Sequence, residues 1–322
     1  MRSTIPALAL VFVFCLVIPA HSAQIDPYVL NDGELVMSWN VQQFLETPLA
    51  KKYVRTSFEE LLKSNAQFHT LLKDLELDPM KDISRVTVSG STDPNGRGIV
   101  IVTGKFNRDK IQALAVKLVA DPNSKDKLKV HKDGGLTIYE IAGEDRPTFV
   151  TFAGESTMLA SRSREVLKEA VSRTSGKVGE PKKELAALIE KASDKDTLWL
   201  AALPSKDNLK SVPVGDPQQK QAVEKVTGIS GTVRVDKDVN IELLFHNADM
   251  ASADAVNKAL QDGINLLKFF APNLAKEKPE YASLNDIINT LHTGVKDTTV
   301  RLTGELSAAS IEKSLKALKN EK

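Results

Sequence analysis

The sequence predicts an α+β protein of two similar modules, each an antiparallel sheet with helices packed on one face. Short segments of alternating apolar residues joined by turn sequences, such as Asp93 to Gly96, predict β-hairpins. Segments between them carry apolar residues at the three- and four-residue spacing of helices. The stretch Val100 to Ile111 also returns as Val300 to Ile311, with four identical positions. We interpret this return as an internal duplication, because copying one sheet-and-helix unit doubles the core.

The first module is expected to span residues 24–174. Its first strand is predicted from Gly33, in GELVMSWNV, and the long helical region after it is predicted to break near Asn65. The remaining expected elements are, in order, the hairpin RVTVSG–GIVIVTGKF, a helix capped by Asn107, short β segments with a turn at Asp133 to Gly135, and a helix at 164–173.

Residues 175–183, SGKVGEPKK, collect glycine, proline and lysine and predict a linker. The second module, 184–322, is expected to contain a helix in KELAALIEKAS, the strand TLWLAAL, a helix near 218–225, a hairpin turning at Asp236 to Asp238, helices capped by Ser252 and Ser307, a helix in SLNDIINTLH, and the strand TTVRLTGEL.

Gly104 and Gly304, one in each copy of the repeated stretch, are expected to mark a bend or close packing before a helix. The junction at Asn107 also resembles the one at Ser252, so two pairings of the copies stay open.

Residues 1–22 predict a secretory signal peptide. Arg2 precedes an apolar run, Ala7 to Ala20, that is shorter than the ~18 residues of a transmembrane helix. Small residues follow it, so we expect cleavage after Ser22, with Ala23 as the alternative. An uncleaved anchor is the other interpretation, because Arg2 alone carries the positive charge.

The single cysteine, Cys15, lies in the signal and is preceded by Phe14, where a lipoprotein signal has a small residue. The mature chain is therefore expected to lack cysteine, which excludes disulfides, thiolate catalysis and zinc-thiolate sites. This composition fits a periplasmic or extracellular protein with no transmembrane segment after cleavage.

Charge and aromatic content exclude further classes of function. Lysine and arginine number 43 and aspartate and glutamate 42, and the charges are interspersed, so no basic footprint for nucleic acid is present. Aromatic residues make up 5% of the chain, too few for a platform on which bases or sugars stack.

No catalytic, cofactor-binding or metal-binding residues are predicted, and no cofactor. The chain lacks the G-x-G-x-x-G, Walker and H-E-x-x-H motifs. Lys105 lies in a strand without a phosphate-binding glycine loop, and Ser156 lacks the second glycine of a nucleophile elbow. The mature histidines show no metal-ligand spacing; His69 and His292 are expected in helices, and His131 and His246 at strand ends.

Trp39 and Trp199 lie in the expected opening strand of each module. Their equivalent placement suggests the two sides of a binding cleft. Packing of both rings in the core is the favoured interpretation, because large aromatic side chains dominate cores.

Several segments resemble exported proteins of unknown function from planctomycete-type bacteria. They are ELVMSWNVQQFLETPLAKKY, LDPMKDISRVTV, IVIVTGKFNRDKI, TLWLAALP and VRLTGELSAASIEKSLKAL, and they span both modules. The resemblance implies an exported protein and the duplicated α+β architecture. It implies no activity and no site residues.

Three functions stay open. The favoured one is a non-catalytic exported protein, structural or partner-binding, because catalytic signatures are missing. The second is a carrier of a lipid or another small apolar ligand, because the apolar stretch Leu266 to Ala271 would line a cavity between sheet and helix. The third is an enzyme with an unrecognised site. The expected partner is accordingly a protein or an apolar small molecule.

Overall fold

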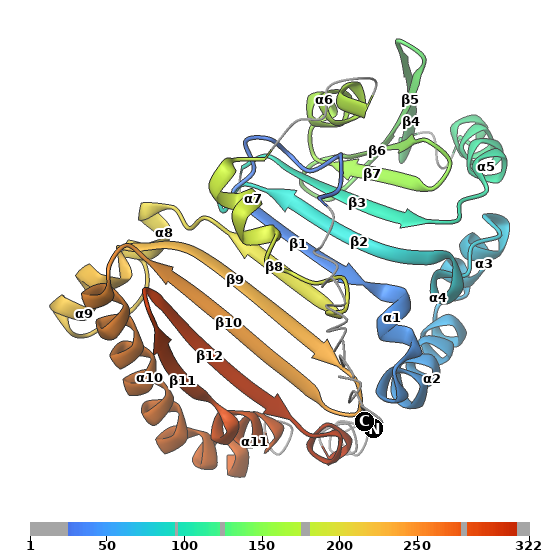
Figure 1. The fold of residues 1–322 in the computed structure, drawn as a ribbon. Helices are drawn as coiled ribbons and strands as arrows, with labels where there is room; N and C mark the ends of the chain where they lie inside the picture. The colour runs from blue at the N-terminus through green and yellow to red at the C-terminus, as the bar shows by residue number, and fades with distance from the viewer. Residues whose placement is uncertain (1–24, 94–95, 123–125, 175–180, 278–281, 314–322) are drawn as a thin grey trace, which may run out of the picture.

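The computed structural model describes residues 25–93, 96–122, 126–174, 181–277 and 282–313 (Figure 1). The predicted signal peptide, its cleavage site at Ser22 and Ala23, and most of the predicted linker lie outside these residues. The described chain is an α+β protein with one antiparallel sheet of 12 strands, in the order β11-β12-β10-β9-β8-β1-β2-β3-β7-β6-β5-β4. None of the described helices is long and apolar enough to cross a membrane.

The strands are β1 (Leu35–Asn40), β2 (Ile83–Gly90), β3 (Gly98–Gly104), β4 (Leu128–Asp133), β5 (Leu136–Ile141), β6 (Thr148–Ala153), β7 (Thr157–Ser161), β8 (Leu198–Ala202), β9 (Val226–Val235), β10 (Val239–Asn247), β11 (His292–Lys296) and β12 (Thr299–Leu306). The helices are α1 (Val41–Glu46), α2 (Pro48–Ser64), α3 (Ala66–Asp74), α4 (Pro79–Asp82), α5 (Arg108–Ala120), α6 (Arg164–Thr174), α7 (Lys183–Ile189), α8 (Lys206–Lys210), α9 (Pro217–Val223), α10 (Met250–Glu277) and α11 (Ala282–Thr290), and residues 308–313 after Ser307 are also helical.

The predicted hairpins are confirmed. β2 pairs with β3, β4 with β5, and β9 with β10, all antiparallel. Gly134 and Gly135 turn the β4–β5 hairpin with φ of 55° and 84°, a left-handed conformation that glycine adopts without steric cost. These turns follow from local sequence, which is why they could be predicted.

The strands of both predicted modules lie in one sheet, because β1 of the first pairs with β8 of the second. From this central pair the order runs outward as β2 and β3 on one side and β9 and β10 on the other. Helix α5 follows β3 and α10 follows β10. By position, the stretch that starts at Val100 on β3 therefore corresponds to β10, and not to β12, which carries Val300. The duplication itself stays a prediction.

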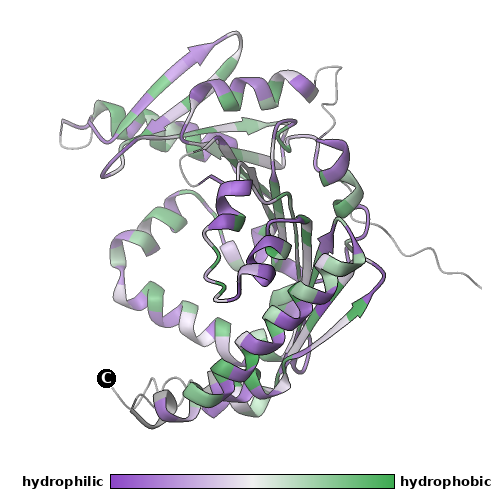
Figure 2. Ribbon diagram, turned by 90° about the vertical axis from the view of Figure 1, so that its left-hand side faces the viewer, coloured by the Kyte–Doolittle hydropathy of each residue, from purple (hydrophilic) through white to green (hydrophobic). Residues whose placement is uncertain are grey.

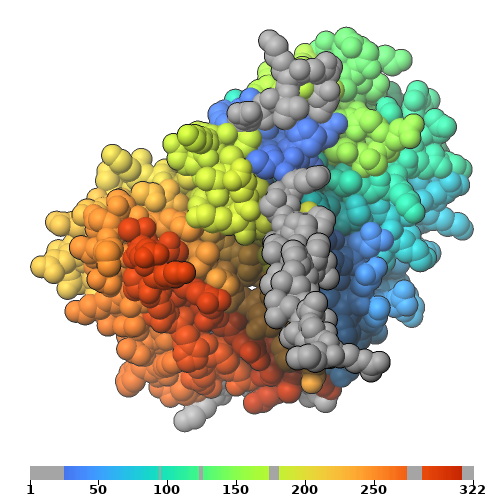
Figure 3. All heavy atoms as spheres, viewed as in Figure 1, coloured from blue at the N-terminus to red at the C-terminus, as the bar shows by residue number. Residues whose placement is uncertain are grey.

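Helices lie on both faces of the sheet and not on one. On the face that we call the α6/α7 face, α6, α7 and the segment 25–34 bury the largest cluster of the core, which includes Val29, Ile99, Leu159, Leu167 and Ile189. Figure 3 shows α7 and this segment lying over the sheet on the near side. The opposite, α5/α10 face is covered at its two ends, by α5 over Tyr139 and by α9 and α10 over Val300.

Helices cover both faces of the sheet because its strands carry apolar residues on both sides. In β3, Ile99 and Ile101 point to the α6/α7 face, while Val100 and Val102 point to the other. Strands that are apolar on both sides require cover on both sides. The sheet in Figure 2 accordingly has helices on each side of it and hydrophobic residues along its strands.

Helix starts follow the expected capping chemistry, with one correction. The side chains of Asn65, Asn107 and Ser307 each accept a hydrogen bond from the backbone N–H three residues on, at 3.0 to 3.2 Å. Ser252 is not the cap of α10, because this helix already begins at Met250. The carboxylate of Asp249 accepts from the Ser252 N–H at 2.7 Å and caps the helix instead.

Strand β11 was not expected, and it corrects the placement of His292. This residue begins β11 instead of ending a helix. β11 is a short edge strand with the sequence HTGVK, which has no apolar alternation, so only its pairing with β12 forms it.

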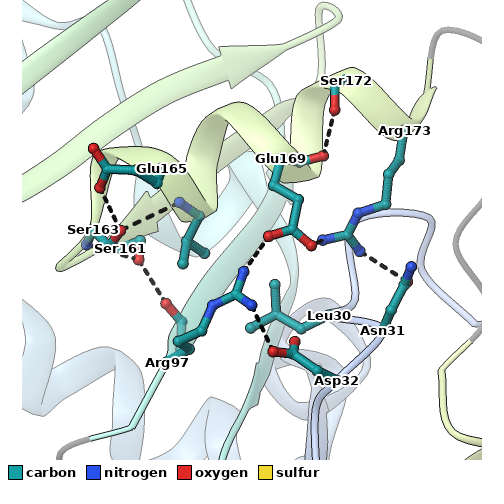
Figure 4. A network of polar contacts seen from close by, with 12 residues as sticks. Leu30, Asn31, Asp32, Arg97, Ser161, Ser163, Glu165, Glu169, Ser172 and Arg173 are labelled. Atoms are coloured by element: carbon teal, nitrogen blue, oxygen red, sulfur yellow. Dashed lines mark hydrogen bonds and ion pairs between the residues drawn. The ribbon is translucent and has the colours of Figure 1, made fainter.

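A polar network ties the segment 25–34 to the sheet and to α6 (Figure 4). Arg173 is 7% exposed and donates to the Val29 carbonyl at 2.8 Å, to Asn31 Oδ1 at 3.1 Å and to Glu169 Oε1 at 2.8 Å. Glu169 also pairs with Arg97, whose other amino group donates to Asp32 at 2.6 Å. One buried guanidinium therefore fixes a segment more than a hundred residues away in sequence.

Candidate functional site

An apolar surface that the described helices cover only in part lies on the α5/α10 face between the helices at its two ends. We call it the apolar floor; it consists of Met37, Trp39, Val86, Val88, Val100, Leu198 and Leu200, on strands β1, β2, β3 and β8. Met37 lies opposite both Val88 and Leu200 in the strand register. Side chains directly opposite each other share one face and touch, so the floor is continuous.

The two faces of these central strands differ in burial. On the α6/α7 face, Val36, Ile101 and Ala201 are at most 1% exposed. On the floor the side chains are only half-buried, and Trp39 is 37% exposed. Among the described residues, no floor side chain belongs to a buried core cluster. The floor is therefore an apolar surface at the middle of the sheet that the described helices leave unsealed.

The floor offers contact and no reacting group. All seven of its side chains are uncharged, and the Trp39 ring lies against Phe44 of α1 with 5.6 Å between ring centroids. Apolar area removed from water is worth about 25 cal/mol per Å². Such a surface suits an acyl chain or a similarly apolar ligand, since a polar ligand would lose hydrogen bonds with water there.

A groove of about 580 Å³ lies between α2, α3 and α4, within the size range of small-molecule sites. Its apolar lining consists of Phe58, Leu62, Leu72, Leu77, Pro79 and Met80, and its polar lining of Arg55, Glu59, His69, Lys73, Glu76, Asp78 and Lys81. Helix α4 leads directly into β2, the strand that carries Val86 and Val88 of the floor. The groove, which Pro79, Met80 and Lys81 of α4 help to line, therefore lies close to the start of β2.

Two carboxylates of the groove are already engaged. Glu76 pairs with Lys110 at 2.9 Å and accepts from Asn107 at 2.9 Å, and the hydrogen bond from Lys110 lowers the pKa of Glu76. Asp78 caps α4 through the Met80 N–H and pairs with Lys81 at 2.7 Å. Because these pairs are exposed, each contributes only modestly to stability.

The two tryptophans do not form opposite sides of a cleft. Trp199 is 4% exposed in the core of the α6/α7 face, as core packing predicts, whereas Trp39 lies on the floor. In the register Trp199 lies opposite Ser38, one residue away from Trp39, and a shift of one residue in a strand reverses the face.

The histidines lie apart from one another. His246 contacts Ser230 at 3.0 Å and Thr299 at 3.3 Å, and burial lowers its pKa, with Lys191 adding to the effect. His131 pairs with Glu140 at 2.7 Å within β4 and β5, and His69 lines the groove. In the described part of the chain, no group of three or more histidine, cysteine, aspartate or glutamate side chains is placed to hold a metal ion.

Lys105 and Ser156 both line an open hollow of about 720 Å³, which the sequence did not place together. Arg108, Asp109 and Glu155 share this hollow. The Gly104 N–H donates to the Ser156 carbonyl at 2.8 Å, so Ser156 holds the end of β3 through its backbone. This role agrees with the expected turn serine.

The stretch Leu266 to Ala271 does not line a cavity between sheet and helix, contrary to expectation. Leu266, Leu267, Phe269 and Phe270 face solvent, and Phe269 is 71% exposed. Helix α10 packs on the sheet through Ala253 and Val256, and Leu267 is exposed although it lies on the same side of the helix as Val256. The helical spacing was correct, but spacing alone does not tell which part of a long helix the rest of the chain covers.

Sequence reasoning also missed the floor. Its signal was present in GIVIVTG and TLWLAAL, where apolar residues occupy both alternating sets of positions. Such runs predict strands buried on both faces. Only the positions of the helices in the folded protein show that the α5/α10 face of these strands is left partly uncovered.

This geometry defines an α+β protein with a continuous antiparallel sheet and an apolar, uncharged contact surface. No protein-family model matches the chain, and no curated protein matches it. Among solved structures, the chain is similar to crystal form I of the Treponema protein TP0453, at 10% identity and a TM-score of 0.44, over 92% of this chain and 99% of that one. At this level the similarity carries no conclusion about function.

Proposed function

We propose that the protein is an exported, non-catalytic carrier of a lipid or another apolar ligand, which it binds on the apolar floor. The observation that supports this most is the contrast between the two faces of β1 and β8: Val36 and Ala201 are sealed, while Met37 and Leu200 remain half-buried. An apolar ligand would complete the cover that the described helices leave open.

The floor has the chemistry of a carrier site. Burying one leucine-sized side chain fully stabilises by about 1.5–3 kcal/mol, so a ligand that covers several half-exposed floor residues gains affinity without any ion pair. Export stays part of the proposal. Mass spectrometry of the protein recovered outside the cytoplasm tests it, with Ala23 expected as the first residue.

Replacing Leu200 with glutamine is expected to weaken binding of the uncharged apolar dye N-phenyl-1-naphthylamine by about tenfold, because a buried amide loses hydrogen bonds with water. The measurement is a fluorescence titration of the mature chain. Leu244→Gln is the matched control, since Leu244 is a half-buried strand leucine on the other face, opposite Ser230 and Arg301. Equal loss in both variants, or no binding by the unmodified chain, would contradict the proposal.

Partner binding is the second candidate, favoured by the exposed Leu266, Phe269 and Phe270 on α10. Apolar patches of this kind often mark interaction sites. A photo-crosslinking residue at position 270 is expected to capture a protein in the cell envelope, whereas one at the exposed Val116 of α5 is not. Absence of any adduct at position 270 counts against this candidate.

A further inference from the structure

The groove between α2, α3 and α4 is lined both by apolar side chains and by cationic side chains that pair with no acidic group in the described part of the chain. Its apolar side chains are buried or half-buried, among them Leu72 of α3 and Phe58 and Leu62 of α2. Arg55 and Lys73 line the same groove from these two helices and are exposed. An apolar lining with charge at its margin is the arrangement that an amphiphile requires.

The charges of the groove are unevenly matched. Glu76 and Asp78 are held by Lys110 and Lys81. Among the described residues, the side chains of Arg55, Lys73 and Glu59 make no hydrogen bond or ion pair, although the Lys73 carbonyl accepts from the Glu76 N–H. Arg55, Lys73 and Glu59 remain, two cations and one carboxylate, a balance of +1. A ligand with a single negative charge complements this balance.

We infer that this groove binds a single-chain amphiphile with a carboxylate head group, its tail against Phe58, Leu62 and Leu72 and its carboxylate at Arg55 and Lys73. The inference rests on the proposed carrier function and adds to it a second site, separate from the floor, whose ligand class is a fatty carboxylate. Hydrogen bonds from cations to a carboxylate are roughly twice as strong as neutral ones, and they orient the chain in one direction. The groove volume of about 580 Å³ accommodates such a chain.

The test compares oleate with oleyl alcohol, which has the same chain and no charge. Isothermal titration of the mature protein at low salt is expected to show oleate binding about tenfold more tightly, since two exposed cations together contribute this order of affinity. The double variant Arg55→Gln/Lys73→Gln is expected to remove the preference and leave the alcohol unchanged. Glu59→Gln is expected to tighten oleate binding a few-fold, because it removes a like charge from the groove.

Lys63→Gln is the matched control, since Lys63 is an exposed cation on α2 that does not line the groove. It is expected to leave both affinities unchanged, and 0.5 M salt is expected to shrink the oleate preference. If neither oleate nor oleyl alcohol binds, the proposed carrier function and the groove inference are both contradicted. Equal binding of both ligands, or an oleate preference that survives in the double variant, overturns the groove inference alone.

Discussion

Replacing Arg173 with alanine is expected to lower the free energy of unfolding by about 3 kcal/mol. The substitution leaves the buried Val29 carbonyl and the partly buried Asn31 Oδ1 without this donor. An unsatisfied buried polar group costs about 1–3 kcal/mol, and removing one partner of a buried ion pair costs about 3–5 kcal/mol. The Glu169 side chain is 41% exposed, so water partly replaces the ion pair that Glu169 loses. The expected cost therefore lies at the low end of the range for a buried ion pair.

Urea denaturation measures this effect, and Arg97→Ala is the control within the same network. The Arg97 side chain is 45% exposed, and its partners Asp32 and Glu169 are also well exposed. We therefore expect its loss to cost less than about 1 kcal/mol. If Arg173→Ala cost no more than Arg97→Ala, the buried guanidinium would not be what holds the segment 25–34 in place.

Replacing Gly104 with alanine is expected to destabilise the protein by about 2–3 kcal/mol. A Cβ at this position would lie 2.3 Å from the Asp82 carbonyl oxygen. This oxygen accepts a hydrogen bond from the Lys105 N–H at 2.7 Å, so it cannot retreat without breaking that bond. Overpacking against fixed backbone costs about 1–3 kcal/mol, and strain at the β2–β3 pair adds to it.

Gly304→Ala is the matched comparison, because Gly304 occupies the same position in the repeated stretch. The nearest atom to a Cβ there is Leu291 Cδ2 at 2.8 Å, the end of a flexible side chain. Rotation of Leu291 relieves the contact, so we expect a cost below about 1 kcal/mol. Thermal and urea unfolding of both variants check the difference. Equal costs would show that the backbone contact with Asp82 is not what requires glycine at position 104.

The part of the fold that depends on neighbours in sequence could be predicted. The turn at Asp133 to Gly135 and the caps at Asn65 and Asn107 rest on residues within a few positions of one another. The joining of both halves into one sheet could not, because residues 35–40 and 198–202 pair across more than 150 positions. Many β-rich strands satisfy the same pattern, and only the assembled sheet selects β8 as the neighbour of β1.

The candidate site was harder to predict than the fold for a related reason. The apolar residues of the floor were visible, and so was the apolar stretch from Leu266. Whether other parts of the chain cover the floor or the stretch from Leu266 depends on where long-range packing places each helix. Helix α10 covers Val300 and Phe245 at one end of the sheet, and α5 covers Tyr139 and Phe152 at the other. The strands between them keep apolar side chains that are only half-buried.

The two tryptophans allow the most direct measurement of the carrier function, because they lie on opposite faces of the sheet. Trp39 belongs to the floor, and Trp199 is buried on the α6/α7 face. In the variant Trp199→Phe only Trp39 emits, and in Trp39→Phe only Trp199 does. A dibrominated fatty alcohol, whose bromine atoms quench tryptophan on close contact, is expected to quench Trp39 strongly and Trp199 hardly at all. Equal quenching of both, or of neither, would contradict binding on the floor.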